Sequence, residues 1–137
     1  MIVHPGCSII AEGGDIYIGD YVIIEEKVRI LNRLKKDEQG KPIKKDMMIG
    51  SYNVFEVYAH LENTNIGNLN EFQHRSVVQE STIGDCCQVN PCVSVPRGTT
   101  LESFSVVYEE GKVRKNMEPN EEAKKTSIKE LCMFLLE

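Results

Sequence analysis

Apolar side chains return at every sixth position through the middle of the chain, and every third return brings the same pair of residues. Ile49-Gly50 is followed 17 residues later by Ile66-Gly67 and, after another 17, by Ile83-Gly84. Steps of six, six and five make up each of these 17-residue repeats, and further steps of six lead to Val107. The apolar anchors of this pattern are Ile49, Phe55, Leu61, Ile66, Phe72, Val78, Ile83, Val89, Val95, Leu101 and Val107.

This period predicts a three-sided parallel solenoid, with a short strand on each side and a tight turn at each corner. Stacked coils would bury the anchors in one continuous column. The glycines are expected to supply the backbone angles that the corners need. Asn53 and Asn70 lie one coil apart, and we expect them to stack inside as an amide ladder. Small residues generally follow each anchor by four places, namely Asn53, Ala59, Asn70, Ser76, Thr82, Cys87, Val93, Thr99 and Ser105.

The same pattern extends toward the N-terminus. Val3 and Ile9 are six residues apart, Gly13-Gly14-Asp15 interrupts the phase, and Ile18-Gly19 restores it. The chain is expected to begin within the solenoid rather than with a cap. A first coil of this kind would leave strand edges open to a partner. We therefore expect Val3, Ile9 and the corner at Tyr21 to lie on a partner-binding surface.

A long insertion separates Ile30 from Ile49, which are 19 residues apart where five would suffice. The surplus predicts a loop extruded from a corner at about 32–47. Its net charge is +3, whereas residues 47–108 carry a net charge of −4. The loop is either a solvated turn or a contact arm for an acidic partner. The lysines assigned to such an arm are Lys35, Lys36, Lys41, Lys44 and Lys45.

The repeat stops after Val107, and the residues that follow are mostly charged. Residues 1–108 are expected to form the solenoid, and 109–137 a connector and a helix. Asn120 is a suitable N-cap, and Glu121 and Glu122 would then occupy the first turn. The helix is expected to fold back along one flat face or over the terminal coil. Its apolar stripe is Ile128, Leu131, Cys132 and Leu135, with Met133, Phe134 and Leu136 outside it. We expect Ile128, Leu131 and Leu135 to contact a partner protein.

Composition narrows the possible functions. The 137 residues suffice for one domain, and a net charge of −5 argues against a nucleic-acid partner. No apolar run approaches the length of a membrane span, and the N-terminus does not resemble a signal peptide. The five cysteines lack CxxC spacing, which disfavours a zinc site at Cys86, Cys87 and Cys92. Cys7 and Cys87 fall on inward positions, which indicates buried thiols in a reducing compartment.

Hexapeptide solenoids include enzymes, so we considered catalysis. Acyltransferases of this fold use a histidine base between subunits, and gamma-type carbonic anhydrases hold zinc with three histidines. His4, His60 and His74 occupy different places in the repeat, and no two are five residues apart. We therefore expect no catalytic site, cofactor or metal. An acyltransferase or a carbonic-anhydrase-like trimer is the alternative.

Several segments resemble the dynactin subunit 6 family. They are Val3-His4-Pro5-Gly6, Ile24-Glu25-Glu26, Asn53-Val54-Phe55-Glu56-Val57, the Cys86-Cys87 pair, Val95-Pro96 and the closing Leu131-Cys132-Met133-Phe134-Leu135-Leu136. The resemblance covers nearly the whole chain. The family carries roughly one more coil before the segment that matches Val3, and a longer final helix.

The resemblance implies an all-β fold, a left-handed parallel β-helix, with a C-terminal α-helix. It also implies a non-catalytic adaptor subunit in the pointed-end complex of dynactin, in the cytoplasm and on the cytoskeleton. The implied role is support of dynein-driven microtubule transport and cargo attachment. The implied partners are dynactin subunit 5, the pointed-end actin-related protein and other dynactin subunits, with neither nucleic acid nor membrane insertion.

Overall fold

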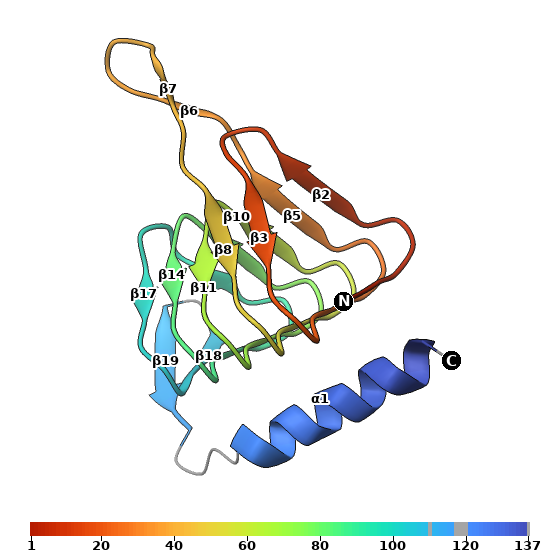
Figure 1. Cartoon of the computed structure of the whole chain (residues 1–137). Coiled ribbons are helices and arrows are strands. Elements are labelled where there is room, and N and C mark those ends of the chain that lie inside the picture. The colour runs from red at the N-terminus through yellow and green to blue at the C-terminus, as the bar shows by residue number, and fades with distance from the viewer. Residues whose placement is uncertain (110, 117–120, 137) are drawn as a thin grey trace.

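The chain folds into a three-sided prism of stacked coils, with one helix lying beside it (Figure 1). The computed structural model describes residues 1–109, 111–116 and 121–136. Each wall of the prism is a sheet of short strands, because a strand spans only one side of a coil. This is the predicted solenoid.

Strands from successive coils pair in parallel and form three sheets. Sheet A contains β1 (Ile2–Val3), β4 (Ile23–Ile24), β9 (Val54–Phe55), β12 (Glu71–Phe72), β15 (Gln88–Val89) and β18 (Ser105–Glu109). Sheet B contains β2 (Ser8–Ala11), β5 (Arg29–Asn32), β10 (His60–Glu62), β13 (Val77–Gln79) and β16 (Ser94–Val95). Sheet C contains β3 (Ile16–Ile18), β8 (Met47–Ile49), β11 (Asn65–Ile66), β14 (Thr82–Ile83) and β17 (Thr100–Leu101).

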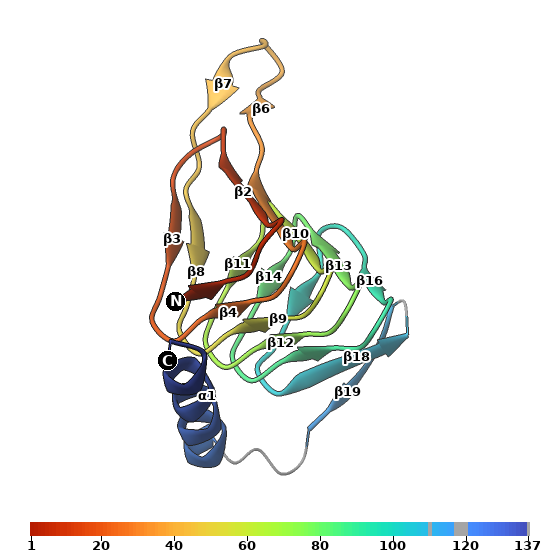
Figure 2. The same cartoon turned by 90° about the vertical axis from the view of Figure 1, so that its right-hand side faces the viewer.

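The coil is left-handed. Figure 2 looks at the prism from its N-terminal end, where β1, β2 and β3 follow one another counter-clockwise while later coils recede from the viewer. Parallel crossovers are almost always right-handed in other folds. The hand implied by the family resemblance is therefore confirmed.

The predicted anchors form the core. All of them from Ile49 to Val107 are buried, and each pairs in register with the anchor of a neighbouring coil. Phe55 and Phe72 pair in register, with ring centroids 4.9 Å apart and rings nearly parallel at 7°. Stacked anchors thus remove a continuous apolar column from water, which is the main favourable term in folding.

The small residue at the corner between sheets B and C is not where the sequence pattern placed it. Thr64 and Ser81 are buried there, three places after their anchors, whereas the predicted Thr82 is exposed on a strand. The corner is one residue shorter than the others, so its inward position also comes one residue earlier.

The prediction that glycines supply the corner angles is confirmed at Gly6 and Gly98, with φ of 79° and 77°, but it is wrong for the glycines of the Ile-Gly pairs. The left-handed backbone at the corner between sheets C and A belongs to Tyr21, Tyr52, Leu69, Cys86 and Phe104, with φ between 55° and 66°. This conformation costs a non-glycine residue about 1–2 kcal/mol. From Tyr52 onward, the backbone N–H of each of these corner residues donates to a carbonyl of the preceding coil. The N–H of Leu69, for example, donates to the carbonyl of Ser51 at 3.0 Å. These bonds hold the corners in place.

Glycine is needed next to the anchors for a different reason, which is close approach between coils. A Cβ atom at Gly50 would lie only 2.5 Å from the carbonyl oxygen of Gly67 in the next coil. Any side chain at this position would force the coils apart.

The two predicted ladder residues are buried as expected, but they bond to backbone rather than to each other's amides. Asn53 Oδ1 accepts the N–H of Asn70 at 2.9 Å, and Asn53 Nδ2 donates to Gly67 O at 2.9 Å. Asn70 repeats the arrangement with the N–H of Cys87 at 2.7 Å and with Gly84 O at 2.9 Å. Each amide therefore joins one coil to the next.

The predicted loop at 32–47 leaves the prism between sheets B and C as an antiparallel hairpin. Its strands are β6 (Lys35–Lys36) and β7 (Pro42–Ile43). At the tip, Asp37 Oδ1 accepts the N–H groups of Gln39 and Lys41, both at 2.9 Å. The tip is therefore an ordered turn.

Beyond the last coil, β18 turns back into antiparallel β19 (Lys112–Lys115), which lies inside the segment predicted as a connector. The helix α1 (Glu121–Leu136) follows, with Glu121 and Glu122 in its first turn as predicted. The predicted N-cap, Asn120, lies outside the described residues. Figures 1 and 2 show α1 running along the corner between sheets C and A, back toward β1.

Candidate interaction surfaces

The N-terminal end of the prism exposes side chains that elsewhere would be core. Val3 and Ile9 pair in register with the buried anchors Ile24 and Ile30, so they face inward. Nevertheless Val3 is 45% exposed and Ile9 is 39% exposed. β1, β2 and β3 are each the edge of their sheet. An apolar surface bounded by open strand edges is a typical docking surface.

Tyr21, the third predicted residue at this end, takes part in an internal contact. Its ring stacks on that of Tyr52 with centroids 5.2 Å apart. The Lys129 ammonium of α1 lies 5.4 Å from the Tyr21 ring centroid and 5.8 Å from that of Tyr52. The two tyrosines therefore anchor the helix through cation–π contacts.

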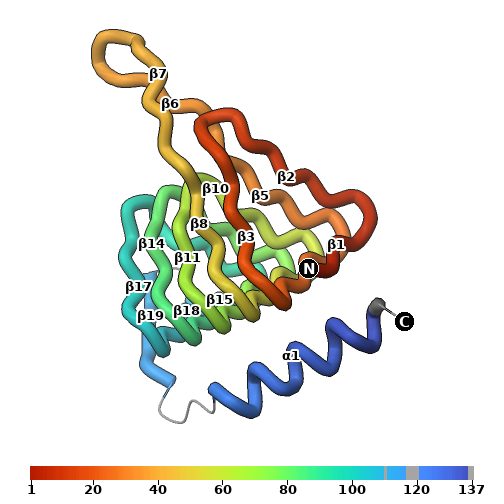
Figure 3. Tube along the Cα trace, in the orientation of Figure 1, coloured from red at the N-terminus to blue at the C-terminus, as the bar shows by residue number. Residues whose placement is uncertain are grey.

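The apolar stripe predicted for the helix is only partly used for packing. Cys132 is buried and Ile128 is half-buried, whereas Leu131 and Leu135 are exposed. The helix contacts β1, and its C-terminal end lies at the N-terminal end of the prism (Figure 3). Burial raises the pKa of the Cys132 thiol, which keeps it protonated and unreactive near neutral pH. No helix in the described part of the chain is both long and apolar enough to cross a bilayer.

The hairpin displays its lysines to solvent, but they are not all equivalent. Lys35, Lys36, Lys41, Lys44 and Lys45 are exposed. Lys35 Nζ lies 3.0 Å from Glu80 Oε1, which also accepts from Arg97 at 3.0 Å. The hydrogen bond from Lys35, with a further contribution from Arg97, holds the pKa of Glu80 below its usual value. Lys35 therefore fixes the hairpin to the body of the prism.

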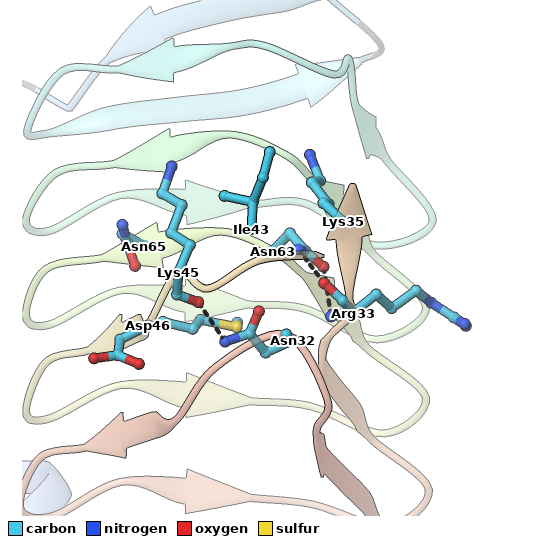
Figure 4. A pocket seen from close by; sticks show the side chains of 10 residues that line it. Asn32, Arg33, Lys35, Ile43, Lys45, Asp46, Asn63 and Asn65 are labelled. Carbon is cyan, nitrogen blue, oxygen red and sulfur yellow. Dashed lines mark hydrogen bonds between the residues drawn. The ribbon is translucent and has the colours of Figure 1, made fainter. Parts of the chain in front are cut away.

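A pocket lies at the base of the hairpin (Figure 4). Asn32 Nδ2 donates to Lys45 O at 2.9 Å, and Asn63 bonds both the N–H and the carbonyl of Arg33, at 2.9 and 3.0 Å. The charged ends of Lys35, Lys45 and Arg33 point away from these asparagines. Asn32 and Asn63 thus hold the base of the hairpin in place.

The three histidines lie apart, each beside a glutamate. His4 Nδ1 is 3.2 Å from Glu26, and His74 Nδ1 is 4.0 Å from Glu56. His60 lies on sheet B, 3.8 Å from Glu62, and burial lowers its pKa. Within the described residues, no group of three or more His, Cys, Asp or Glu side chains is arranged to hold a metal ion.

Sequence reasoning missed several exposed apolar residues near the N-terminal end. Ile10 lies on the outer face of sheet B, and Tyr17 and Met48 lie on that of sheet C. The hairpin adds Leu34 and Ile43, and the helix adds Met133 and Phe134. Ile10, Tyr17 and Met48 could have been found from the sequence, because each is an apolar residue next to an inward anchor, where the repeat usually has a polar residue.

No family model matches the chain. It is similar to three curated proteins named dynactin subunit 6. Identity is 38% over 109 residues to that of Nematostella vectensis, 35% over 114 residues to that of Danio rerio, and 34% over 111 residues to that of Xenopus tropicalis. Each match covers 73% of this chain and 59%, 56% and 54% of the respective relative. The chain thus spans a little over half the length of these relatives.

Among solved structures, the chain is similar to a hexapeptide transferase family protein from Anaplasma phagocytophilum. The TM-score is 0.61 at 14% identity, over 93% of this chain and 75% of that protein. This likeness concerns the fold alone. The expected resemblance is confirmed: the chain is similar to proteins named dynactin subunit 6 and has a hexapeptide-repeat solenoid fold.

Proposed function

We propose that this chain is a non-catalytic adaptor subunit of dynactin, placed in its pointed-end complex. In this role it would support dynein-driven transport and cargo attachment, in the cytoplasm and on the cytoskeleton. Its partners would be dynactin subunit 5, the pointed-end actin-related protein and other dynactin subunits. The similarity to proteins named dynactin subunit 6 supports this proposal.

One structural observation carries the proposal, namely the open apolar end of the prism. Val3 and Ile9 face inward, no further coil of the described residues covers them, and α1 contacts β1, the strand of Val3. A surface of this kind suits a permanent neighbour in an assembly better than a small-molecule substrate. We propose that Val3, Ile9, the Tyr21 corner, the hairpin lysines and Ile128, Leu131 and Leu135 contribute to contacts with neighbours.

Affinity purification from cell extract tests the proposal. The tagged chain should recover dynactin subunits, identified by mass spectrometry, and the double variant Val3→Lys/Ile9→Lys should lose most of them. Tyr108→Lys/Val113→Lys is the matched control, because both residues are exposed near the opposite end of the prism. Equal recovery with both double variants would show that the N-terminal end is not the docking surface.

The alternative, an acyltransferase or a carbonic-anhydrase-like enzyme, is tested separately. His60→Gln and His74→Gln should leave recovery of dynactin subunits unchanged. Turnover of acetyl-coenzyme A or hydration of carbon dioxide by the purified chain, lost in either variant, would overturn the non-catalytic proposal.

A further inference from the structure

A groove runs along the outer face of sheet A beside the helix. One wall is α1, and the floor is formed by sheet A and its corner with sheet C. The residues that line the groove are Val54, Leu69, Asn70 and Glu71 from the prism and Ala123, Lys124, Ser127 and Ile128 from the helix. The helix covers only one margin of the sheet (Figure 2).

The wall formed by the helix continues as an apolar stripe. Ala123, Ser127, Leu131 and Phe134 follow one another at spacings of four, four and three, so they lie on one side of α1. The first two line the groove, which places Leu131 and Phe134 along the same wall. Phe134 is 71% exposed and Leu131 is 44% exposed. This stripe differs from the packed one, which contains Ile128 and Cys132.

The outer face of sheet A is acidic where it borders the groove: Glu71 lines the groove, and Glu25 and Glu56 line the neighbouring pocket with His74 and Arg75. Glu71 pairs in register with Val54. Glu25 and Glu56 each come directly after an inward residue of a neighbouring strand, and these inward residues, Ile24 and Phe55, pair with each other. The three glutamates therefore lie on the same outer face of the sheet. Burial, together with the charges of Glu71 and Glu25, raises the pKa of Glu56. None of these three carboxylates forms an ion pair with a lysine or arginine among the described residues, although Glu56 lies 4.0 Å from His74.

The nearby cations do not neutralise this surface. Lys124 stands on the groove wall at the helix N-terminal end, far from Phe134 along α1. Arg75 lies at the rim beside Glu56, where its guanidinium covers the Tyr58 ring at 4.4 Å. The apolar side of the helix wall therefore lies next to a sheet face that carries three carboxylates, one of them, Glu71, in the groove itself.

We propose that this groove binds a basic amphipathic helix of another protein. The apolar face of that helix would pack against Leu131, Phe134 and Val54, and its lysines or arginines would meet Glu25, Glu56 and Glu71. A helix fits because α1 offers a straight wall, and packed helices lie about 8–10 Å apart. Charge complementarity selects a basic partner. The proposal goes beyond the adaptor role and does not require that the chain enter dynactin.

A second copy of the chain is a poorer occupant. Its basic segment is the hairpin, which is short, offers β-structure and already uses Lys35 to pair with Glu80. The hairpin also projects from the side of the prism opposite sheet A (Figure 2).

Fluorescence anisotropy with the whole chain tests the proposal. The probe is a labelled synthetic peptide of leucine and lysine, about five helical turns long, with its leucines on one face. A peptide of the same composition in scrambled order is the control. We expect saturable binding of the amphipathic peptide with one site, and binding at least about tenfold weaker for the scrambled peptide.

Paired variants locate the site. Glu56→Gln/Glu71→Gln should weaken binding about fivefold or more, whereas Glu12→Gln/Glu38→Gln, which removes the same charge elsewhere, should change it less than about twofold. Phe134→Ser should weaken binding, and Met133→Ser, on a different side of the helix, should not. Thermal melts should confirm that all four variants fold.

Three outcomes would overturn the proposal. The first is absence of peptide binding, and the second is equal loss in the two charge-matched double variants. The third is self-association of the chain that disappears in Glu56→Gln/Glu71→Gln, which would make a second copy the occupant.

Discussion

The two ends of the prism are built from the same kinds of residue in the same phase, yet one is open and the other is closed. At the N-terminal end the inward residues Val3 and Ile9 are 45% and 39% exposed. In the last complete coil Val95 and Leu101 are 5% and 4% exposed, and Val107 after them is 1% exposed. A repeat therefore specifies which side chains face inward, whereas their burial depends on what covers the coil.

The closed end shows how such a column can be finished. β18 does not lead into another coil but turns back into antiparallel β19, which occupies the next place in sheet A. Lys115 of β19 contacts Glu102 Oε2 at 3.0 Å and thereby joins the returning strand to the last coil. At the other end, β1, β2 and β3 have no such strand beside them among the described residues.

An introduced carboxylate should give the largest difference in stability between the core and the open end. Ile83→Asp should unfold the chain, because Ile83 is 3% exposed between Ile66 and Leu101, and an unpaired buried carboxylate costs several kcal/mol or more. Val3→Asp should melt within a few degrees of wild type, since water reaches the new carboxylate. Circular dichroism melts compare the two, and a neutral Ile83→Asp would show that the assigned phase is wrong.

The asparagine ladder should give the next largest effect. Asn70→Ala leaves the N–H of Cys87 and the carbonyl of Gly84 without their partner, at about 1–3 kcal/mol for each buried group. Asn68→Ala is the control, because Asn68 accepts the Ser51 N–H on the outside of the same corner, where water can replace it. Urea unfolding measures both. Equal losses would show that burial of Asn70 does not make its hydrogen bonds more important for stability than those of Asn68.

Hydrogen exchange tests the comparison of the two ends without mutation. β2 and β16 are the two edge strands of sheet B, one at each end of the prism. The amides of β2 should exchange faster, because its anchor Ile9 is exposed while Val95 of β16 is buried. Faster exchange in β16 would mean that side-chain burial at the end coils does not control local opening.

The smallest expected effect is the contribution of His60, in the middle of the prism, to the pH dependence of stability. Burial lowers the pKa of His60 in the folded state below its usual 6.5, so the unfolded chain binds more protons when the pH falls through that range. Stability should therefore be complete above about pH 6.5 and decrease as the solution is acidified. His60→Gln should reduce the fall in melting temperature between pH 7 and pH 5. An unchanged slope would assign that fall to other groups.

The fold was largely predictable because the repeat records the core directly. Every anchor from Ile49 to Val107 is buried, because the six-residue period brings an apolar residue to the inward position of each side of the coil. The chain's own spacing could not give the hand of the coil, because both hands place the same residues inward. The hand followed from the family resemblance.

Other features depend on contacts between residues distant in sequence, and these could not be predicted. The positive φ of Tyr52 and Leu69 reflects hydrogen bonds to the coil before, which override local preference. Similarly, α1 buries Cys132 and lays Lys129 on Tyr21 and Tyr52, while Leu131 on the predicted stripe remains exposed. The apolar spacing located the helix, but it did not show which side of it the prism would contact.

The corner column of Tyr21, Tyr52, Leu69, Cys86 and Phe104 has a wider consequence. Backbone bonds, not side-chain chemistry, maintain its geometry, so aromatic, aliphatic and thiol groups all occupy equivalent places. Successive coils set these groups about 4.8 Å apart along a straight edge. A side chain along this edge can therefore be exchanged one coil at a time, which would change the surface offered to another molecule and leave the apolar interior as it is.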